Sequence, residues 1–294
     1  MSTIEDFIKE VDDESWKEFM PSGFTKEMFK EITKYYDAEV FIEAGRIIRQ
    51  RAKSFDSLDF IERAEEIATL FGSFKNPDKE TVLTPWRVVN MQIAKGLGGL
   101  NFYDDNFESM TDGAKPNLHW VDTNVTESAY HPETKIIDIN AKTGLYPLHA
   151  AMSLYYQYVQ NNDDNRFDAD SVYRGILENN IYAIAKTPMA KTITERTLTG
   201  YKKYKTNVAY IENFLNTLKS SIEEGKRQVE EAFEKVKFNV VIGNPPYQES
   251  TNDKAMRSGQ QKRVRNVFQD FQLVADVVAQ NFSCLIYPGG RWIH

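Results

Sequence analysis

The chain has 294 residues, of which 41% are hydrophobic and 27% are charged, and its formal net charge is −7. This composition is typical of a globular protein and excludes a fibre or a disordered chain, and the length allows one large domain plus an accessory piece. No apolar run approaches the ~20 residues that span a bilayer, and the amino terminus lacks the pattern of a secretion signal, so we expect no membrane association.

Cysteine, histidine and charge exclude several further classes. Cys284 is the only cysteine and the four histidines are scattered, so neither an intrachain disulfide nor a zinc site is expected. A single thiol suits a reducing compartment, and we expect a cytoplasmic protein. The negative net charge argues against a surface that binds nucleic acid everywhere, although it leaves room for a local basic groove.

Residues 1–80 are predicted to form a helical accessory region. Apolar residues recur at helical spacing over 27–36, 40–53 and 59–71. Asp37 is a candidate N-cap for the second of these helices, whose apolar face includes Val40 and Ile47. No catalytic constellation occurs here, so we expect a structural role for this region.

A new unit begins at Thr84-Pro85. Thr84 can cap a helix, Pro85 suits its first turn, and apolar residues follow at helical spacing. Residues 96–134 are rich in glycine, asparagine and aspartate, which predicts a long surface connection with a short strand near 118–121.

Five strands are predicted in the remainder, near residues 136–139, 181–185, 208–212, 238–242 and 283–287. Helical segments separate them, so we expect an α/β protein with one doubly wound, mostly parallel sheet. The first strand leads through a turn at Thr143-Gly144 into a helix from Leu145, which is the start of a Rossmann-type unit that binds a nucleotide over the turn. An ordinary strand-to-helix turn would give the same pattern.

The fourth strand ends at Gly243 and continues as Asn244-Pro245-Pro246-Tyr247. Two adjacent prolines exclude helix and strand, so these residues form a stiff loop at the carboxyl end of a strand, where open α/β sheets bind ligands. An amide oxygen, a main-chain carbonyl and an aromatic ring can together hold a flat heterocycle that bears an exocyclic amine. The alternative is a plain turn that the two prolines punctuate.

The tetrapeptide and its strand resemble the catalytic loop of S-adenosylmethionine-dependent amino-methyltransferases. With the Thr-Pro segment ahead of the first strand, the chain most resembles the adenine-specific (N6) DNA methyltransferases of restriction-modification systems, and among them the methylase domains of type I and type IIG enzymes. The resemblance covers roughly residues 80–294 and implies a Rossmann-like methyltransferase domain over 81–294. It stops before the family's later strands and target-recognition region, so we expect a truncated methylase.

The resemblance also implies roles for individual residues. Asn244 and the carbonyl of Pro245 would hold the amine of a flipped base, Pro246 would stiffen the loop, and Tyr247 would stack on the base. The cofactor would be S-adenosylmethionine. Its expected binding residues are Thr84, Pro85, Asp138, Asn140, Lys142, Thr143, Gly144, Thr187 and Asn213.

Three of the expected cofactor positions depart from the family pattern. Lys142 stands where the first glycine of the cofactor loop usually lies, so a side chain occupies space where backbone usually meets ligand. Ala185 stands where a carboxylate usually binds the ribose, which leaves Thr187 or the backbone for that role. Asn213 replaces an acid that accepts the adenine amine of the cofactor, and its amide oxygen can accept the same hydrogen bond.

The stretch after the tetrapeptide is basic and contains no acid over 254–265. Its cations are Lys254, Arg257, Lys262, Arg263 and Arg265. They either follow a DNA phosphate backbone or form a solvated loop. The expected partners are DNA and a restriction or specificity subunit or fused domain. Two alternatives stay open: a non-catalytic methylase-like fragment that binds DNA or a subunit, and methylation of a protein glutamine or of RNA, because such enzymes share the tetrapeptide.

Overall fold

The computed structural model describes residues 4–21, 23–35, 37–74, 83–162, 167–246, 248–249 and 265–286. Tyr247 of the tetrapeptide therefore lies outside the described residues, as do the cations Lys254, Arg257, Lys262 and Arg263. Arg265 is described only as backbone, in the short strand β10 (Arg265–Asn266), which pairs antiparallel with β9 (Gln248–Glu249).

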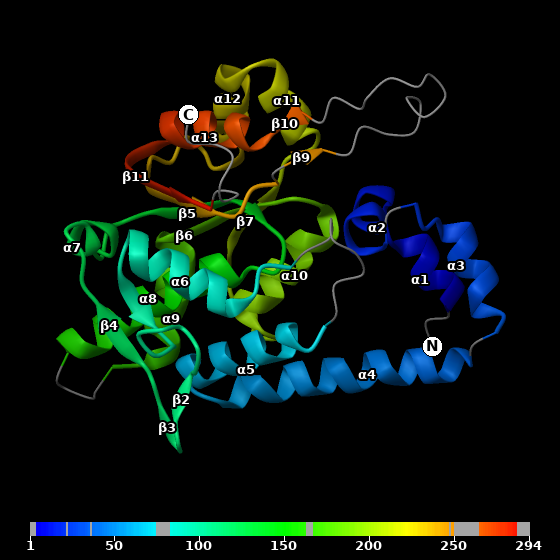
Figure 1. Cartoon of the computed structure of the whole chain (residues 1–294), viewed down its shortest axis with the longest axis horizontal. Helices are drawn as coiled ribbons and strands as arrows, with labels where there is room; N and C mark the ends of the chain where they lie inside the picture. Colours follow the sequence, from blue (N-terminus) through cyan, green and yellow to red (C-terminus); the bar gives the residue numbers. More distant parts are fainter. Residues whose placement is uncertain are drawn as a thin grey trace.

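A five-stranded parallel sheet forms the centre of the molecule (Figure 1). Its strands are β5 (Ile136–Ala141), β6 (Ile181–Ala185), β7 (Asn207–Tyr210), β8 (Phe238–Gly243) and β11 (Ala279–Leu285). The spatial order is β11-β8-β5-β6-β7, so all the predicted strands lie in one sheet and the α/β fold is confirmed. Strands β6 and β7 lie on one side of β5, whereas β8 and β11 lie on the other. The topological switch point therefore lies between the carboxyl ends of β5 and β8.

Helices cover both faces of the sheet (Figure 1). One layer consists of α11 (Phe214–Ser220), α12 (Ile222–Ala232) and α13 (Phe268–Val278), and the other of α5 (Phe60–Gly72), α6 (Trp86–Gly96), α8 (Leu145–Asn161), α9 (Ala169–Asn179) and α10 (Pro188–Thr199). Ile137 and Val241 face the first layer, whereas Ile136 and Val240 face the second. Strands β5, β6 and β8 are buried on both faces, which explains why a run such as Val240-Val241-Ile242 is continuously apolar rather than alternating.

The amino-terminal region is helical, as predicted. It contains α1 (Ile4–Glu10), α2 (Asp13–Phe19), α3 (Lys26–Thr33), α4 (Ala38–Ser54), the 3₁₀ turn η1 (Phe55–Ser57) and α5. Asp37 caps α4 by accepting from the amide of Glu39. The apolar face predicted for α4 exists but is exposed to solvent, with Val40 65% and Ile47 55% accessible.

The third helix of the predicted set, α5, instead packs into the central core. Its residues Phe60, Ala64 and Ile67 are buried in one cluster with residues of α8 and β5. The core is therefore continuous from α5 to the sheet, and the domain boundary expected near residue 80 stays a prediction.

One segment prediction is wrong in part. Within the expected surface connection, β1 (Gly99–Asn101) pairs with β4 (His119–Val121) and is buried, and the amide of Leu100 donates to the hydroxyl of Ser153 in α8. Two helices separate β7 from β8, since Ser221 ends α11 and caps α12 by accepting from the amide of Glu224.

The other elements of the 96–134 stretch are β2 (Thr111–Asp112), β3 (Lys115–Pro116) and α7 (Thr126–Ala129). Among the helices of the described residues, none has the length and apolar character needed to cross a membrane.

Candidate functional site

The residues expected to do chemistry meet at the carboxyl ends of β5 and β8. Asn244 directly follows β8, and the side-chain amide of Asn140 in β5 donates to the main-chain oxygen of Asn244 at 3.1 Å. Pro245 is buried and Pro246 is half-buried. The strand carrying the predicted cofactor acid and the strand carrying the catalytic loop thus end side by side at one edge of the sheet.

The amide of Asn244 has a defined orientation. Its Nδ2 donates to Oγ1 of Thr84 at 3.0 Å, so the opposite atom, Oδ1, is the free acceptor. That Oδ1 is buried and has no hydrogen-bond partner among the residues that the structure describes. An unpaired buried acceptor costs about 1–3 kcal/mol, and such an atom calls for an explanation by function. An amide oxygen in this position can accept a hydrogen bond from an N–H donor.

The structure corrects the role expected for Thr84 as a helix cap. Pro85 occupies the N-cap position of α6, which has no side-chain cap, and the carbonyl of Pro85 accepts from the amide of Val88. The hydroxyl of Thr84 instead accepts from Asn244, and Pro85 lies one residue ahead of the first helical turn in which it was expected.

Gly243 allows β8 to approach Asp138 of β5. Its φ is +145°, and a Cβ added there would lie 2.8 Å from Oδ1 of Asp138. Asp138 is buried, and Oδ1 accepts from the amide of Asn140 at 2.9 Å. Burial raises the pKa of Asp138 from 3.8 to about 7, although the hydrogen bond from Asn140 opposes the shift.

This buried acid predicts a pH-dependent stability. Between pH 3.8 and about 7 the folded chain keeps a proton on Asp138 that the unfolded chain has released, so stability falls as pH rises through this window. In Asp138→Asn, which does not titrate, we expect about 2–3 kcal/mol less loss between about pH 5 and about pH 8. Urea unfolding at several pH values measures this, and parallel pH profiles for the two proteins would contradict it.

Gln92 of α6 is a site residue that the sequence did not reveal. Its Nε2 donates to the carbonyl of Cys284 in β11 at 2.9 Å, and its Oε1 accepts from the hydroxyl of Tyr146 in α8. Gln92 therefore ties α6 to the strand next to β8. The available signal was a polar residue between the apolar Met91 and Ile93.

The predicted cofactor turn has the geometry of a Rossmann-type unit. Gly144 is left-handed with φ +76°, and a Cβ there would lie 3.0 Å from the backbone of Thr194 in α10. The carbonyl of Thr143 accepts from Thr197 of the same helix at 2.5 Å. Glycine thus permits close packing of α8 on α10, which is one of the roles of glycine in such turns.

Lys142, Thr187 and Asn213 have distinct surroundings. Lys142 forms an ion pair with Glu18 of α2 at 2.5 Å. Thr187 is buried and caps α10 by accepting from the amide of Ala190 at 3.2 Å. Asn213 is exposed beyond β7, the outermost strand, so the structure places it apart from the group formed by Thr84, Asn140 and Asn244.

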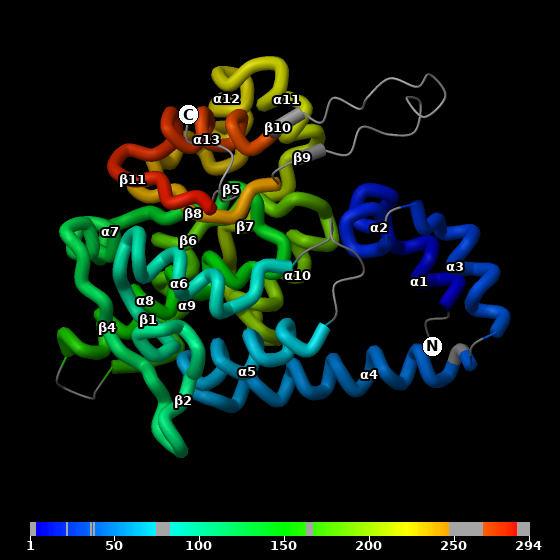
Figure 2. The backbone as a smooth tube through the Cα atoms, viewed as in Figure 1, coloured from blue at the N-terminus to red at the C-terminus, as the bar shows by residue number. Residues whose placement is uncertain are grey.

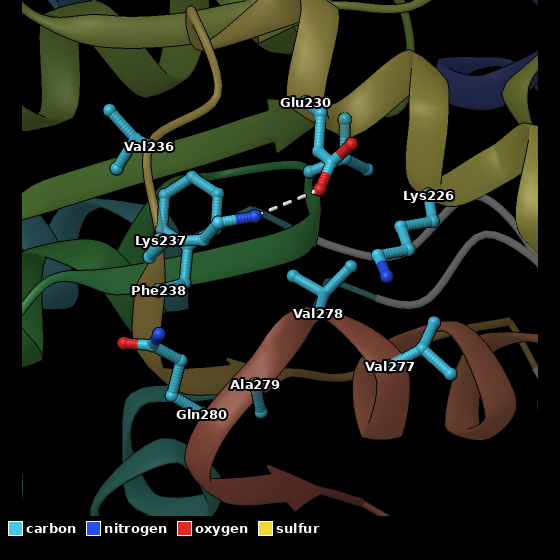
Figure 3. A pocket seen from close by; sticks show the side chains of 10 residues that line it. Lys226, Glu230, Val236, Lys237, Phe238, Val277, Val278, Ala279 and Gln280 are labelled. Carbon is cyan, nitrogen blue, oxygen red and sulfur yellow. Dashed lines mark hydrogen bonds and ion pairs between the residues drawn. The ribbon is translucent and has the colours of Figure 1, made fainter.

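A separate pocket of about 210 Å³ lies at the opposite edge of the sheet (Figure 3). It is lined by Phe238 and Ala279, the first residues of β8 and β11, and by the Lys237–Glu230 ion pair at 3.1 Å. Since it opens at the amino ends of these strands, it is not part of the site around Asn244. The described residues contain no group of acids, histidines and cysteines that could hold a metal ion.

Comparison with known proteins supports the resemblance drawn from the motifs. Residues 179–294 match the family model described as Eco57I restriction-modification methylase, which confirms the resemblance to restriction-modification methylases. No curated protein matches the chain.

One similar solved structure is titled "ATP-dependent Type ISP restriction-modification enzyme LlaBIII bound to DNA". The sequence identity is 17% and the TM-score is 0.36 over 72% of this chain. This chain spans 14% of the length of that enzyme.

Proposed function

We propose that this chain, whose residues 179–294 match a restriction-modification methylase family, is the catalytic part of a DNA methyltransferase that modifies the N6 amine of adenine. The observation that carries the proposal is Oδ1 of Asn244, which is buried and unpaired among the described residues, beside an amide nitrogen that donates to Thr84 at 3.0 Å. The cofactor we propose is S-adenosylmethionine.

The geometry supports recognition of an amine rather than a carbonyl. Oδ1 of Asn244 and the carbonyl of Pro245 are both acceptors, and an exocyclic amine can donate to two acceptors at once. Thr84 and Asn140 hold the side chain and main chain of Asn244, so the acceptors are fixed before substrate arrives. Hydrogen bonds to both N–H groups leave the nitrogen lone pair free for attack, and Tyr247 would stack on the base.

The residues at the carboxyl ends of β5 and β6 suit a nucleoside cofactor. We assign its binding to the strand-end residues Asp138, Asn140, Lys142, Thr143 and Gly144, together with Thr187, Asn213 and the Thr84-Pro85 segment. Bound S-adenosylmethionine would supply a methyl group already activated by its sulfonium, so the protein needs mainly to position the reactants.

The proposed partners follow from charge. A chain with net charge −7 needs another surface to read a DNA sequence, because base recognition requires an element that enters a groove. We propose that a specificity or restriction partner, or a further domain, supplies it, and that the basic stretch including Arg265 contacts phosphates.

Transfer of the tritiated methyl group of S-adenosylmethionine is measured with three acceptors: unmethylated DNA, RNA and a glutamine-bearing release-factor protein. We expect label in DNA, and nucleoside digestion should place it in N6-methyladenine. Label in RNA or protein alone would favour the second alternative. Binding of the cofactor without transfer to any acceptor would favour a non-catalytic module.

A further inference from the structure

Helix α2 of the amino-terminal region lies beside α10 (Figure 2), and its side chains reach the carboxyl ends of three sheet strands. Beyond β6, Ser15 accepts from the amide of Met189 at 3.0 Å, at the start of α10. At the end of β7, the hydroxyl of Tyr210 donates to the carboxylate of Glu14. The amino-terminal region, for which the sequence predicted a structural role, therefore contacts the carboxyl ends of the sheet strands, which is where α/β sheets bind ligands.

Glu18 is the residue of α2 that reaches the ends of both β5 and β6. Its Oε1 lies 2.5 Å from the ammonium of Lys142, which directly follows β5, and its Oε2 pairs with the ammonium of Lys186, which directly follows β6. The side chain is only 10% exposed. The two strand ends are themselves joined, since the amide of Lys186 donates to the carbonyl of Ala141 at 3.0 Å.

The two lysines determine the ionisation state of Glu18. Burial opposes ionisation of Glu18, but Lys186 and Lys142 together outweigh burial and lower its pKa. The group is thus a carboxylate with two ammonium partners. A carboxylate has about four lone-pair sites, so its two ammonium partners leave acceptor capacity on Glu18.

We propose that Glu18 is the carboxylate that accepts hydrogen bonds from the ribose hydroxyls of the nucleoside cofactor. In Rossmann-type units an acid after the second strand of the unit does this, and here that strand, β6, ends in Ala185. Glu18 brings a carboxylate to the same place from a helix that precedes the sheet in sequence. Lys142 and Lys186 position its two oxygens. The inference rests on the proposed function, because it presumes an adenosyl cofactor at this edge.

The experiment is a binding cycle that needs no catalysis. Isothermal calorimetry compares S-adenosylhomocysteine with its 2′,3′-dideoxy analogue, for the native chain and for Glu18→Gln. Because hydrogen bonds to a charged group are strong, we expect Glu18→Gln to weaken binding of the ribose compound about 10- to 100-fold. The affinity of Glu18→Gln for the dideoxy analogue should fall by less than about 3-fold, since this analogue lacks the hydroxyl donors from which Glu18 would accept.

Asp13→Asn is the matched control. It removes the same charge from the same helix at a side chain that is 82% exposed, and we expect native affinity for both ligands. Equal losses for both ligands in Glu18→Gln would assign Glu18 a purely structural role and overturn the proposal. Unchanged or tighter binding would also overturn it, because the carboxylate would then be indifferent to the cofactor or would obstruct it.

A second measurement uses the native chain alone and does not depend on how the variant folds. We expect the native chain to bind S-adenosylhomocysteine about 10- to 100-fold more tightly than the dideoxy analogue, and equal affinities would overturn the inference. If the native chain binds neither ligand, the proposed cofactor falls and the role of Glu18 with it. If the native chain and Glu18→Gln bind the ribose compound equally, only the role of Glu18 falls.

Discussion

Asn244→Ala should reduce methyl transfer to DNA by at least about 100-fold, the scale on which loss of one preorganised polar group slows other enzymes. The substitution removes the acceptor Oδ1 and, with it, the group that we expect to hold the substrate amine. Stability should change little. The variant loses the bond to Thr84, but it also removes a buried acceptor that has no partner in the described part of the chain, and these two effects have opposite sign.

Initial rates with tritiated cofactor measure this effect, and thermal unfolding of the same samples checks the fold. Asn244→Asp is the matched variant, because it keeps acceptor oxygens of the same shape, and it should retain more activity than the alanine variant. Equal incorporation by the native chain and Asn244→Ala would exclude the role assigned to Asn244.

Arg63→Ala should lower the free energy of unfolding by about 3–5 kcal/mol, as expected when one partner of a buried charge network is removed. Arg63 of α5 is 3% exposed and donates to the carbonyls of Arg196, Thr197 and Leu198 at the end of α10, at 3.2, 3.0 and 3.3 Å. Its guanidinium also lies 3.5 Å from Asp56. Truncation leaves these acceptors and a largely buried carboxylate without their cation.

Urea or thermal unfolding followed by circular dichroism measures the loss, which corresponds to a fall in Tm of roughly 5–8 °C for a chain of this size. Arg46→Ala is the control, since Arg46 is 57% exposed and pairs with Glu43 on the surface of α4, where ion pairs contribute little. Indistinguishable unfolding of the two variants would contradict the buried role of Arg63.

Local patterns were sufficient to predict the sheet. A run such as Val240-Val241-Ile242 bounded by glycine can hardly be anything but a buried strand, and the alternation of strands with helices then fixes the parallel class. The same patterns also predicted part of the site. Asn140 and Asn244 lie close together because their strands are parallel neighbours that end on the same side of the sheet.

The contacts between distant segments were not predictable, because they have no periodicity. Nothing in the spacing of α2 relates Glu18 to Lys142, and Thr84 had a sufficient local explanation as a cap until its hydroxyl met Asn244. The exposed face of α4 shows the converse, since helical periodicity at Val40 and Ile47 predicts a helix but does not specify what covers it.

The hydrogen bond from Arg63 to the carbonyl of Leu198 joins residues that are 135 positions apart in the sequence. This separation sets a delay during synthesis on the ribosome, because both residues must have been made before the bond can form. At about 5–20 residues per second, on the order of ten seconds pass between synthesis of α5 and synthesis of the helix end that it holds. During that interval α5 lacks part of the core that buries Phe60, Ala64 and Ile67. Helix α5 therefore completes its packing only after the end of α10 has been made.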